Sequence, residues 1–387
     1  MESPDAHAVR KILSVEPTLQ RLERASSALG LARHELVHAG PPIRDAASVC
    51  RPILHSAITA SLFEGWADSV EQAERLVRDG TIRLRPAQDL DCVVPLADVV
   101  SPSMTLQAVG DGSQVCWTPL NGGVEHVLRV GVLGDEVLAR LRWLNGPFAQ
   151  AYAQALSSPV PVLDLADQGL EGGDDCHGRT GVATVALWKT IERRLNDDAA
   201  AICREFLQRS PSFFLNVWMA ASQLMLRAAR GIPGATVVTA AGGNGTEFGI
   251  RIASKPETWF TARAMPPAVA PGGLGAAEPL GAIGDSAVVD ILGLGAMTTL
   301  ESGVAPALPP FVQGAEGRAS LLAAAHPRFR RTHPRMVVSA RRVVESATVP
   351  IISLGVLDKA GRLGRLTGGY YRPSFDLFGS ALASVNA

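Results

Sequence analysis

Short apolar segments with strand patterning alternate with helical segments along most of this chain, and this alternation constrains the fold most strongly. Residues 35–42 have the pattern of a buried strand that runs into a tight turn, whereas residues 52–66 and 70–78 have helical periodicity. Alternation of this kind is typical of an α/β layer. We therefore predict a mixed α/β (α+β) fold.

The densest helical patterning lies in the middle of the chain, at residues 182–230. It predicts a small helical bundle inserted between two α/β parts. A chain of 387 residues is also too long for one ordinary core. The predicted domains are an N-terminal α/β domain at residues 1–133, a central helical domain at 134–232 and a C-terminal α/β domain at 233–387.

Three further segments carry local predictions. Residues 17–29 have leucines on one side of an amphipathic helix. Residues 236–240 and 248–253 predict two strands that flank the turn Gly242-Gly243-Asn244-Gly245. Residues 336–344 predict a late strand.

Composition narrows the functional class. The formal net charge of -1 gives no basic footprint for nucleic acid. The five cysteines are widely spaced and odd in number, which predicts free thiols in a reducing compartment. The apolar run at residues 287–297 is interrupted by Asp290 and glycines, and the first ten residues lack the pattern of a secretory signal. We expect a soluble, cytoplasmic protein that binds neither nucleic acid nor membrane.

The octapeptide from Gly173 to Thr180 concentrates more chemistry than any other segment. It places Asp174, Asp175, Cys176, His177 and Arg179 side by side. An acid, a base and an anion-binding guanidinium can transfer protons and hold an anionic substrate, so His177 and Asp175 are candidate catalytic residues and Arg179 a candidate substrate ligand. The alternative is a helix N-terminus that Asp174 or Asp175 caps.

Glycine-bearing turns follow several predicted strands. They contain the candidate substrate-binding residues His38, Gly40, Asn121, Gly122, Asn244, Gly245 and Ser286. Loops at strand ends build ligand sites in α/β folds, and their N–H groups bind oxyanions. The alternative for each turn is a plain structural turn, and the alternative for His38 is a satisfied core histidine. None of them matches a dinucleotide or Walker-type phosphate motif.

Three charged residues outside the octapeptide are also candidates. Glu64 lies among apolar residues, where it is either a buried acid or base or an exposed helix end. Asp285 either orients a substrate or caps a helix, and Arg251 can grip a carboxylate in bidentate fashion. Adjacent residues seldom point at one centre, so we expect no metal and no cofactor.

Nine short motifs occur together in a specific order. They are His38-Ala-Gly-Pro-Pro, Phe63-Glu-Gly-Trp, Ser101-Pro-Ser-Met, Asn121-Gly-Gly, Gly173-Asp-Asp-Cys-His-Gly-Arg, Phe213-Phe-Leu-Asn, Asn244-Gly-Thr-Glu-Phe-Gly-Ile-Arg, Trp259-Phe-Thr-Ala and Gly284-Asp-Ser-Ala. From about residue 36 to about residue 369, this order resembles the YlbE-like bacterial family. Members of that family include one subunit of a multi-subunit oxamate carbamoyltransferase of purine catabolism.

The resemblance implies a carbamoyl-group reaction or related C–N bond chemistry on a small carboxylate or ureido substrate, with phosphate or carbamoyl phosphate as the second ligand. It also implies partner subunits, and we expect a homo-oligomer. Two other functions remain open from the residues alone: a non-catalytic subunit that stabilises partner enzyme chains, and a stand-alone amidohydrolase.

Overall fold

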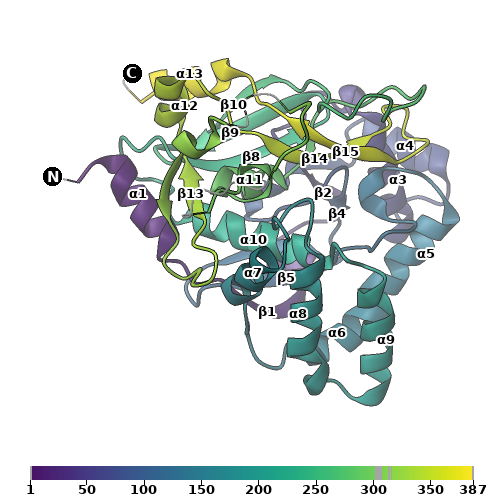
Figure 1. The fold of residues 1–387 in the computed structure, drawn as a ribbon. Coiled ribbons are helices and arrows are strands. Elements are labelled where there is room, and N and C mark those ends of the chain that lie inside the picture. The colour runs from purple at the N-terminus through teal and green to yellow at the C-terminus, as the bar shows by residue number, and fades with distance from the viewer. Residues whose placement is uncertain (1, 301–306, 313, 315, 386–387) are drawn as a thin grey trace.

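The computed structural model describes residues 2–300, 307–312, 314 and 316–385. It has a mixed α/β architecture, as the alternation of segments predicts, with several small sheets and helices packed around them (Figure 1). The helices are α1 (Pro4–Leu13), α2 (Ala25–Ala28), α3 (Arg51–Phe63), α4 (Val70–Arg78), α5 (Asp135–Trp143), α6 (Ala149–Ala155), α7 (Val162–Glu171), α8 (Gly181–Ile191), α9 (Asp197–Gln208), α10 (Phe213–Arg227), α11 (Ala287–Leu292), α12 (Ala340–Ser346) and α13 (Phe375–Ala383).

In the described part of the chain, the strands form five sheets. They are β1 (Thr18–Arg24), β2 (Glu35–His38), β3 (Arg83–Pro86), β4 (Val99–Val100), β5 (Thr105–Gly110), β6 (Val115–Pro119), β7 (Val160–Pro161), β8 (Val238–Asn244), β9 (Glu247–Ile252), β10 (Lys255–Arg263), β11 (Ile283–Gly284), β12 (Leu322–Ala325), β13 (Arg335–Val338), β14 (Ile352–Leu357) and β15 (Arg365–Tyr371). Two sheets have four strands, in the orders β6-β5-β1-β7 and β10-β9-β8-β11, and a third has the order β3-β2-β4. The pairs β12-β13 and β14-β15 complete the set.

Two sheets meet at the ends of β2 and β8. Strand β2 runs parallel to β3, with Glu35 opposite Arg83, and antiparallel to β4. Gly40, just after β2, has φ +77°, and a Cβ there would lie 2.4 Å from the carbonyl carbon of Gly243. Only glycine allows this approach, because the backbone itself occupies the space a side chain would need. The turn at Gly40 is thereby fixed against the β10-β9-β8-β11 sheet.

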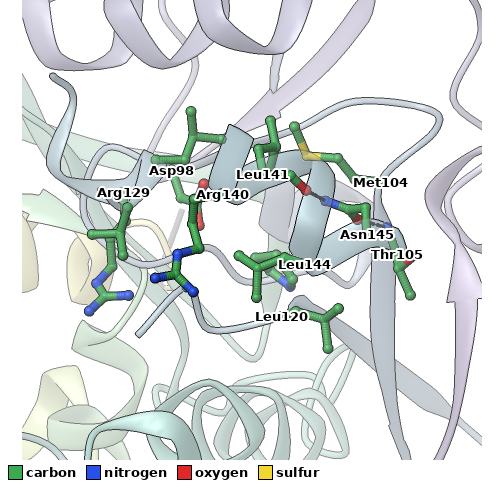
Figure 2. Close-up of a pocket in the computed structure, with 13 residues that line it drawn as sticks. Asp98, Met104, Thr105, Leu120, Arg129, Arg140, Leu141, Leu144 and Asn145 are labelled. Atoms are coloured by element: carbon green, nitrogen blue, oxygen red, sulfur yellow. Dashed lines mark hydrogen bonds between the residues drawn. The ribbon is translucent and has the colours of Figure 1, made fainter. Parts of the chain in front are cut away.

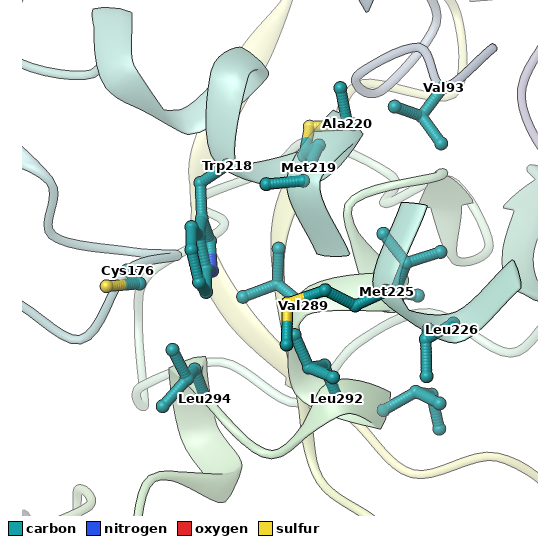
Figure 3. Close-up of a cluster of buried hydrophobic side chains, with 14 of the residues drawn as sticks. Val93, Cys176, Trp218, Met219, Ala220, Met225, Leu226, Val289, Leu292 and Leu294 are labelled. Carbon is teal, nitrogen blue, oxygen red and sulfur yellow. The ribbon is translucent and has the colours of Figure 1, made fainter. Parts of the chain in front are cut away.

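Helix α10 forms the centre of the main apolar core. Almost all of its residues are buried, including Trp218, Met219 and Met225. Figure 3 shows these side chains facing Val289 and Leu292 of α11. Each fully buried side chain of this size contributes about 1.5–3 kcal/mol relative to an exposed one, so α10 fixes α11 firmly. Helix α11 carries residues of the candidate site.

A second apolar core lies under α3, α4 and the β3-β2-β4 sheet. It gathers buried side chains from between residues 25 and 141, together with Leu280, Ile283 and Leu357 from the C-terminal part. The main core contains buried side chains from almost the whole length of the chain, from α1 to residue 381. The three-domain division of the chain stays a prediction. No helix in the described part of the chain is long and apolar enough to cross a bilayer.

The structure corrects three local predictions. Residues 17–29 form strand β1 and the short helix α2 instead of one helix, because β1 pairs with β5 along its whole length. Gly242, Gly243 and Asn244 lie inside β8 and pair with β9 and β11, so the turn begins only at Gly245. Residues 336–344 leave strand β13 at Val338 and continue as helix α12, which Ser339 caps through Arg342 N–H.

The predicted helices at residues 52–66 and 70–78 are confirmed as α3 and α4. Between α5 and α6 the chain remains helical but widens into a π-helical turn at Leu144–Phe148, which contains Pro147. Proline lacks an N–H donor, and a wider turn accommodates the missing hydrogen bond.

Candidate active site

Asp175 organises the loop between α7 and α8. Its Oδ1 accepts hydrogen bonds from the backbone N–H groups of His177 (2.8 Å) and Arg179 (3.0 Å), and its Oδ2 lies 3.1 Å from Nε of Arg179. Cys176 takes a left-handed conformation with φ +66°, which few residues other than glycine adopt. The turn thus holds the backbone of His177 in a defined place.

Asp174 has a different role. Its Oδ2 accepts a hydrogen bond of 2.9 Å from the N–H of Ala183, in the first turn of α8. A carboxylate in this position satisfies a helix N–H group that has no partner within the helix and interacts favourably with the helix dipole. The capping alternative therefore describes Asp174.

His177 pairs with Asp290 of α11. Nδ1 of His177 lies 2.5 Å from Oδ2 of Asp290, and both side chains are buried. The other oxygen of Asp290, Oδ1, accepts hydrogen bonds from the backbone N–H groups of Ala296 (2.8 Å) and Ser353 (3.1 Å). With Asp290 ionised, Nδ1 carries the proton and Nε2 is left as the basic nitrogen. This is the arrangement in which a carboxylate fixes the tautomer and orientation of a catalytic imidazole.

The surroundings of Asp290 oppose and support its charge at the same time. Burial raises the pKa of Asp290, while His177 and the two backbone donors act in the opposite direction. Gly295 packs directly on the pair: a Cβ there would lie 2.4 Å from Oδ1 of Asp290 and 2.9 Å from Cβ of His177. Any larger residue at position 295 would displace the pair.

Nε2 of His177 makes no hydrogen bond within the described residues, and the residue is 7% exposed. The charges of Asp175 and Asp290 act on the hydroxyl group of Tyr370, in β15. Burial raises the pKa of Tyr370, and Asp175 raises it further. At pH 7 the Tyr370 hydroxyl is therefore neutral and can donate a hydrogen bond.

A second polar cluster surrounds Asp285, at the start of α11. Its Oδ1 accepts hydrogen bonds from the N–H of Gly40 (2.8 Å) and from Nε2 of Gln88 (2.6 Å), and its Oδ2 accepts from the N–H of Val94 (3.1 Å). Burial raises the pKa of Asp285 to about 7, against these three donors. Asp285 thus joins three separate segments instead of capping α11.

His38 lies in the same region and is fully buried. Its Nδ1 lies 2.8 Å from the carbonyl oxygen of Ala39, and its Nε2 has no hydrogen-bond partner among the described residues. Burial lowers the pKa of His38 to about 4, so the ring is neutral at pH 7. A neutral, enclosed imidazole fits the core-histidine alternative.

Asn244 and Gly245 build a turn at the end of β8. The side-chain oxygen of Asn244 accepts from the N–H groups of Thr246 (3.0 Å) and Glu247 (2.8 Å), and its amide donates to the carbonyl oxygen of Pro41 (3.0 Å). Gly245 has φ +84°, which suits glycine. Ser286, nearly buried, precedes α11 without capping it.

Asn121 forms a third cluster with Arg129 and the start of α10. Its amide donates to the carbonyl oxygen of Ser212 (2.8 Å) and to Oδ1 of Asn216 (3.0 Å). Its oxygen accepts from Nη1 of Arg129 (2.9 Å) and from the N–H of Gly123 (3.1 Å). Gly122 packs against Val127, where a Cβ would lie 3.0 Å from Cγ1.

The remaining candidates bind other side chains of the protein itself. Arg251 pairs with Asp89 and lies over the ring of Trp259, 4.5 Å from its centroid. Glu64, at the end of α3, accepts hydrogen bonds from the hydroxyl of Ser101 (2.6 Å) and from the N–H of Ser103 (2.7 Å). Arg179 is largely exposed and paired with Asp175. These contacts hold loops and strands together.

The structure connects two of the clusters to the His177 loop. Asp290 lies in helix α11, and Asp285 lies two residues before the helix begins, so one short segment connects the Asp285 cluster to the His177–Asp290 pair. Residues 210–212 join the octapeptide to the Asn121 cluster, because Thr180 donates to the carbonyl oxygen of Pro211 (3.2 Å) and Asn121 donates to that of Ser212. Glu64 binds to a separate turn, at Ser101 and Ser103.

Sequence reasoning missed Asp290, Tyr370 and Arg129. Asp290 was visible as the one carboxylate inside an apolar helical run, a pattern that calls for a partner. Tyr370 and Arg129 carried no comparable signal, since both acquire their neighbours only through long-range packing. No three His, Cys, Asp or Glu side chains in the described part of the chain gather as a metal site.

Comparison with known proteins identifies the family of this chain. Residues 82–286, more than half of the chain, match the family model described as oxamate carbamoyltransferase subunit AllG. This chain belongs to the AllG family. The finer label YlbE-like stays a prediction.

Two relatives of this AllG-family chain come from Escherichia coli K12. The oxamate carbamoyltransferase subunit AllG is 28% identical over 410 residues, covering 98% of this chain and 96% of that protein. The uncharacterized protein YahG is also 28% identical, covering 97% of this chain and 84% of that protein. A crystal structure of a conserved protein of unknown function from Enterococcus faecalis V583 has the same fold, with a TM-score of 0.89 at 24% identity over 99% of this chain and 97% of that one.

Proposed function

We propose that this chain contributes catalytic residues to a carbamoyl transfer, as one subunit of an enzyme with further subunits. Its relationship to an oxamate carbamoyltransferase subunit supports the reaction class and the partner chains. The single observation that carries the catalytic part is the His177–Asp290 pair, whose Nε2 is free of hydrogen bonds to the described residues. The substrate is a small carboxylate or ureido compound such as oxamate.

The proposed step is a displacement at the carbamoyl carbon. In one direction the amide nitrogen of the acceptor attacks carbamoyl phosphate, the C–O bond to phosphate breaks, and Nε2 of His177 takes the proton that the nitrogen loses. In the other direction a phosphate oxygen attacks the ureido carbon, the C–N bond breaks, and protonated His177 returns the proton to the leaving nitrogen. Asp290 is a positioning residue that stabilises the imidazolium ion in both directions.

Compartment and assembly are parts of the same proposal. All five cysteines are free, which supports a reducing compartment such as the cytoplasm. We expect the working enzyme to contain partner subunits in addition to copies of this chain. Light scattering on the chain alone and on the complex purified from its native cell would give both stoichiometries.

The test compares that complex with the isolated chain. Both are supplied with carbamoyl phosphate and oxamate, and phosphate release is followed together with the ureido product. We expect phosphate-coupled transfer in the complex and loss of that transfer when this chain is left out. Hydrolysis without a phosphate requirement would instead indicate an amidohydrolase and would contradict the proposal.

A further inference from the structure

A narrow chamber lies beside the Asn121 cluster, between α5 and the loop at residues 119–129. Its volume is about 30 Å³, enough for one or two water-sized groups. A wider groove of about 460 Å³ adjoins it between α5, α9 and residues 122–127. Both spaces are lined by Gly122 and Arg140, so Arg140 stands where the groove meets the chamber. Figure 2 shows Arg140 among the residues that line the chamber.

Two aromatic rings hold Arg140. Its guanidinium carbon lies 5.2 Å from the ring centroid of Trp143 and 5.9 Å from that of Phe206. Within the residues that the structure describes, no acidic side chain forms an ion pair with it. Stacking restrains the planar group while its N–H edge remains available for a bidentate contact with a carboxylate.

Arg129 supplies a second cation in the chamber. It is bound to neutral oxygen atoms, Oδ1 of Asn121 and the carbonyl oxygen of Gly123, and keeps its charge at pH 7 although burial lowers its pKa to about 10. The nearby carboxyl group of Asp98 is buried, and burial raises its pKa to about 7. The chamber is therefore lined by two arginines and one partly protonated acid. Opposite charge from a ligand would compensate this excess.

The rim of the groove carries several acidic side chains. Glu125 pairs with Arg209 at 3.2 Å, and Glu136 and Glu205 are exposed along the same groove. Exposed carboxylates are well screened by solvent, so they do not prevent a small anion from reaching Arg140. They would oppose a long polyanion that had to lie along the rim. The charges together favour a small, singly charged ligand.

We propose that Arg140 is the carboxylate receptor of a small-molecule site, which takes a planar amide or ureido carboxylate from the groove. The inner chamber then accommodates one end of the ligand, and the Trp143 face orients the guanidinium. The naming of this substrate class rests on the proposed function. The binding itself is independent of turnover and is tested without it.

The experiment measures oxamate binding by titration calorimetry on the full-length chain. Arg140→Ala is expected to weaken binding by about 10- to 100-fold, the range for loss of a charge-assisted hydrogen-bonded contact. Arg140→Lys keeps the charge but loses the bidentate geometry, so it should bind more weakly than the parent and more tightly than the alanine variant. Ethyl oxamate, the neutral ester, should bind at least about tenfold more weakly than oxamate.

Two control variants keep the result specific. Arg142→Ala removes an exposed arginine from the same helix and should leave oxamate binding unchanged. His177→Ala should also bind oxamate within a few-fold of the parent even if it abolishes turnover, which separates failure of this site from failure of the proposed function. Circular dichroism confirms that each variant is folded. Unchanged binding in folded Arg140→Ala, or no saturable binding in the parent chain, would overturn the proposal.

Discussion

Nδ1 of His177 lies 2.5 Å from Oδ2 of Asp290, although 113 residues separate them in the chain. The pair depends on two independent constraints. Asp175 fixes the backbone of the His177 loop, and the packing of α10 on α11 fixes Asp290. Gly295 closes over both side chains. A buried acid and an imidazole held this rigidly are expected where proton transfer is required.

Replacing Glu64 separates a structural carboxylate from a catalytic one. Glu64→Ala leaves the N–H of Ser103 and the hydroxyl groups of Ser101 and Ser103 without their acceptor. We expect the free energy of unfolding to fall by about 1–3 kcal/mol, with turnover per folded molecule unchanged. Denaturant titration and an activity assay measure the two quantities. The exposed Glu345→Ala serves as control, and a folded but inactive Glu64→Ala would place Glu64 in the chemistry.

Two glycines with nearly the same backbone conformation should respond very differently to alanine. Gly40 has φ +77° and Gly80 has φ +78°, but a Cβ at Gly40 would meet Gly243 at 2.4 Å, whereas nothing lies within 4 Å of one at Gly80. Gly80→Ala should cost about 1 kcal/mol from backbone strain alone. Gly40→Ala should cost at least about 3 kcal/mol more, because two backbones must separate. Equal melting temperatures for the two variants would show that the approach of β2 to β8 is not tight.

The helices and the overall class could be predicted because their signals are local. The periodicity of residues 70–78 and the serine before them define α4 without reference to the rest of the chain. Strand β1 was mistaken for a helix because its partner residues in β5 lie 81 to 92 positions away, and three leucines fit a helical face equally well. Non-local pairing can override local periodicity in this way.

The candidate site shows the same difference between residues with local partners and residues with distant partners. The capping alternative anticipated the role of Asp174, which accepts from the N–H of Ala183 in α8, whereas Asp175 accepts from the N–H of His177 in its own loop. Asp285 was a candidate from sequence, but its three hydrogen-bond donors come from segments that only the fold assembles. Arg251 does grip a carboxylate, but one from Asp89 of the same protein. The sequence around a charged residue therefore does not reveal which distant residue becomes its partner in the fold.

Asp285 should make stability depend on pH. Its pKa is about 7 in the folded protein against 3.8 for the unperturbed group. Between these values the folded state holds a proton that the unfolded state has lost, so the contribution of Asp285 to stability falls as pH rises through this window and is constant above about pH 7. Asp98 also has a pKa of about 7, so its contribution to stability falls with rising pH in the same way. His38 and His326, with pKa values lowered to about 4, act in the opposite sense.

Comparison with Asp285→Asn isolates this contribution. From pH 5 to pH 8, the free energy of unfolding of the parent should fall by about 2–3 kcal/mol relative to the variant. Denaturant titrations at four pH values give the difference directly. A difference that stays constant or grows with pH would mean that Asp285 is ionised throughout.

The cysteines should be unreactive in the folded protein. Burial raises the pKa values of the thiols of Cys50, Cys116 and Cys203 to about 12, and those of Cys92 and Cys176 are also raised. At pH 8 a thiol with a pKa near 12 is ionised in about one molecule in ten thousand, and only the thiolate reacts quickly. A thiol-specific disulfide reagent should modify none within minutes, and all five in guanidinium chloride. Rapid native modification of even one thiol would contradict this packing.

The most direct measurement is the turnover of the assembled enzyme containing His177→Ala. Removing His177 leaves Asp290 with two backbone donors among the described residues, so a stability loss of about 1–3 kcal/mol is expected. Turnover should fall at least about 100-fold, the cost of a lost general acid or base, with KM for oxamate within a few-fold of the parent. His326→Gln, which alters another buried histidine, should retain its turnover per folded molecule. A folded His177→Ala enzyme that turns over within a few-fold of the parent would contradict the catalytic role and leave this chain as a subunit that stabilises its partners.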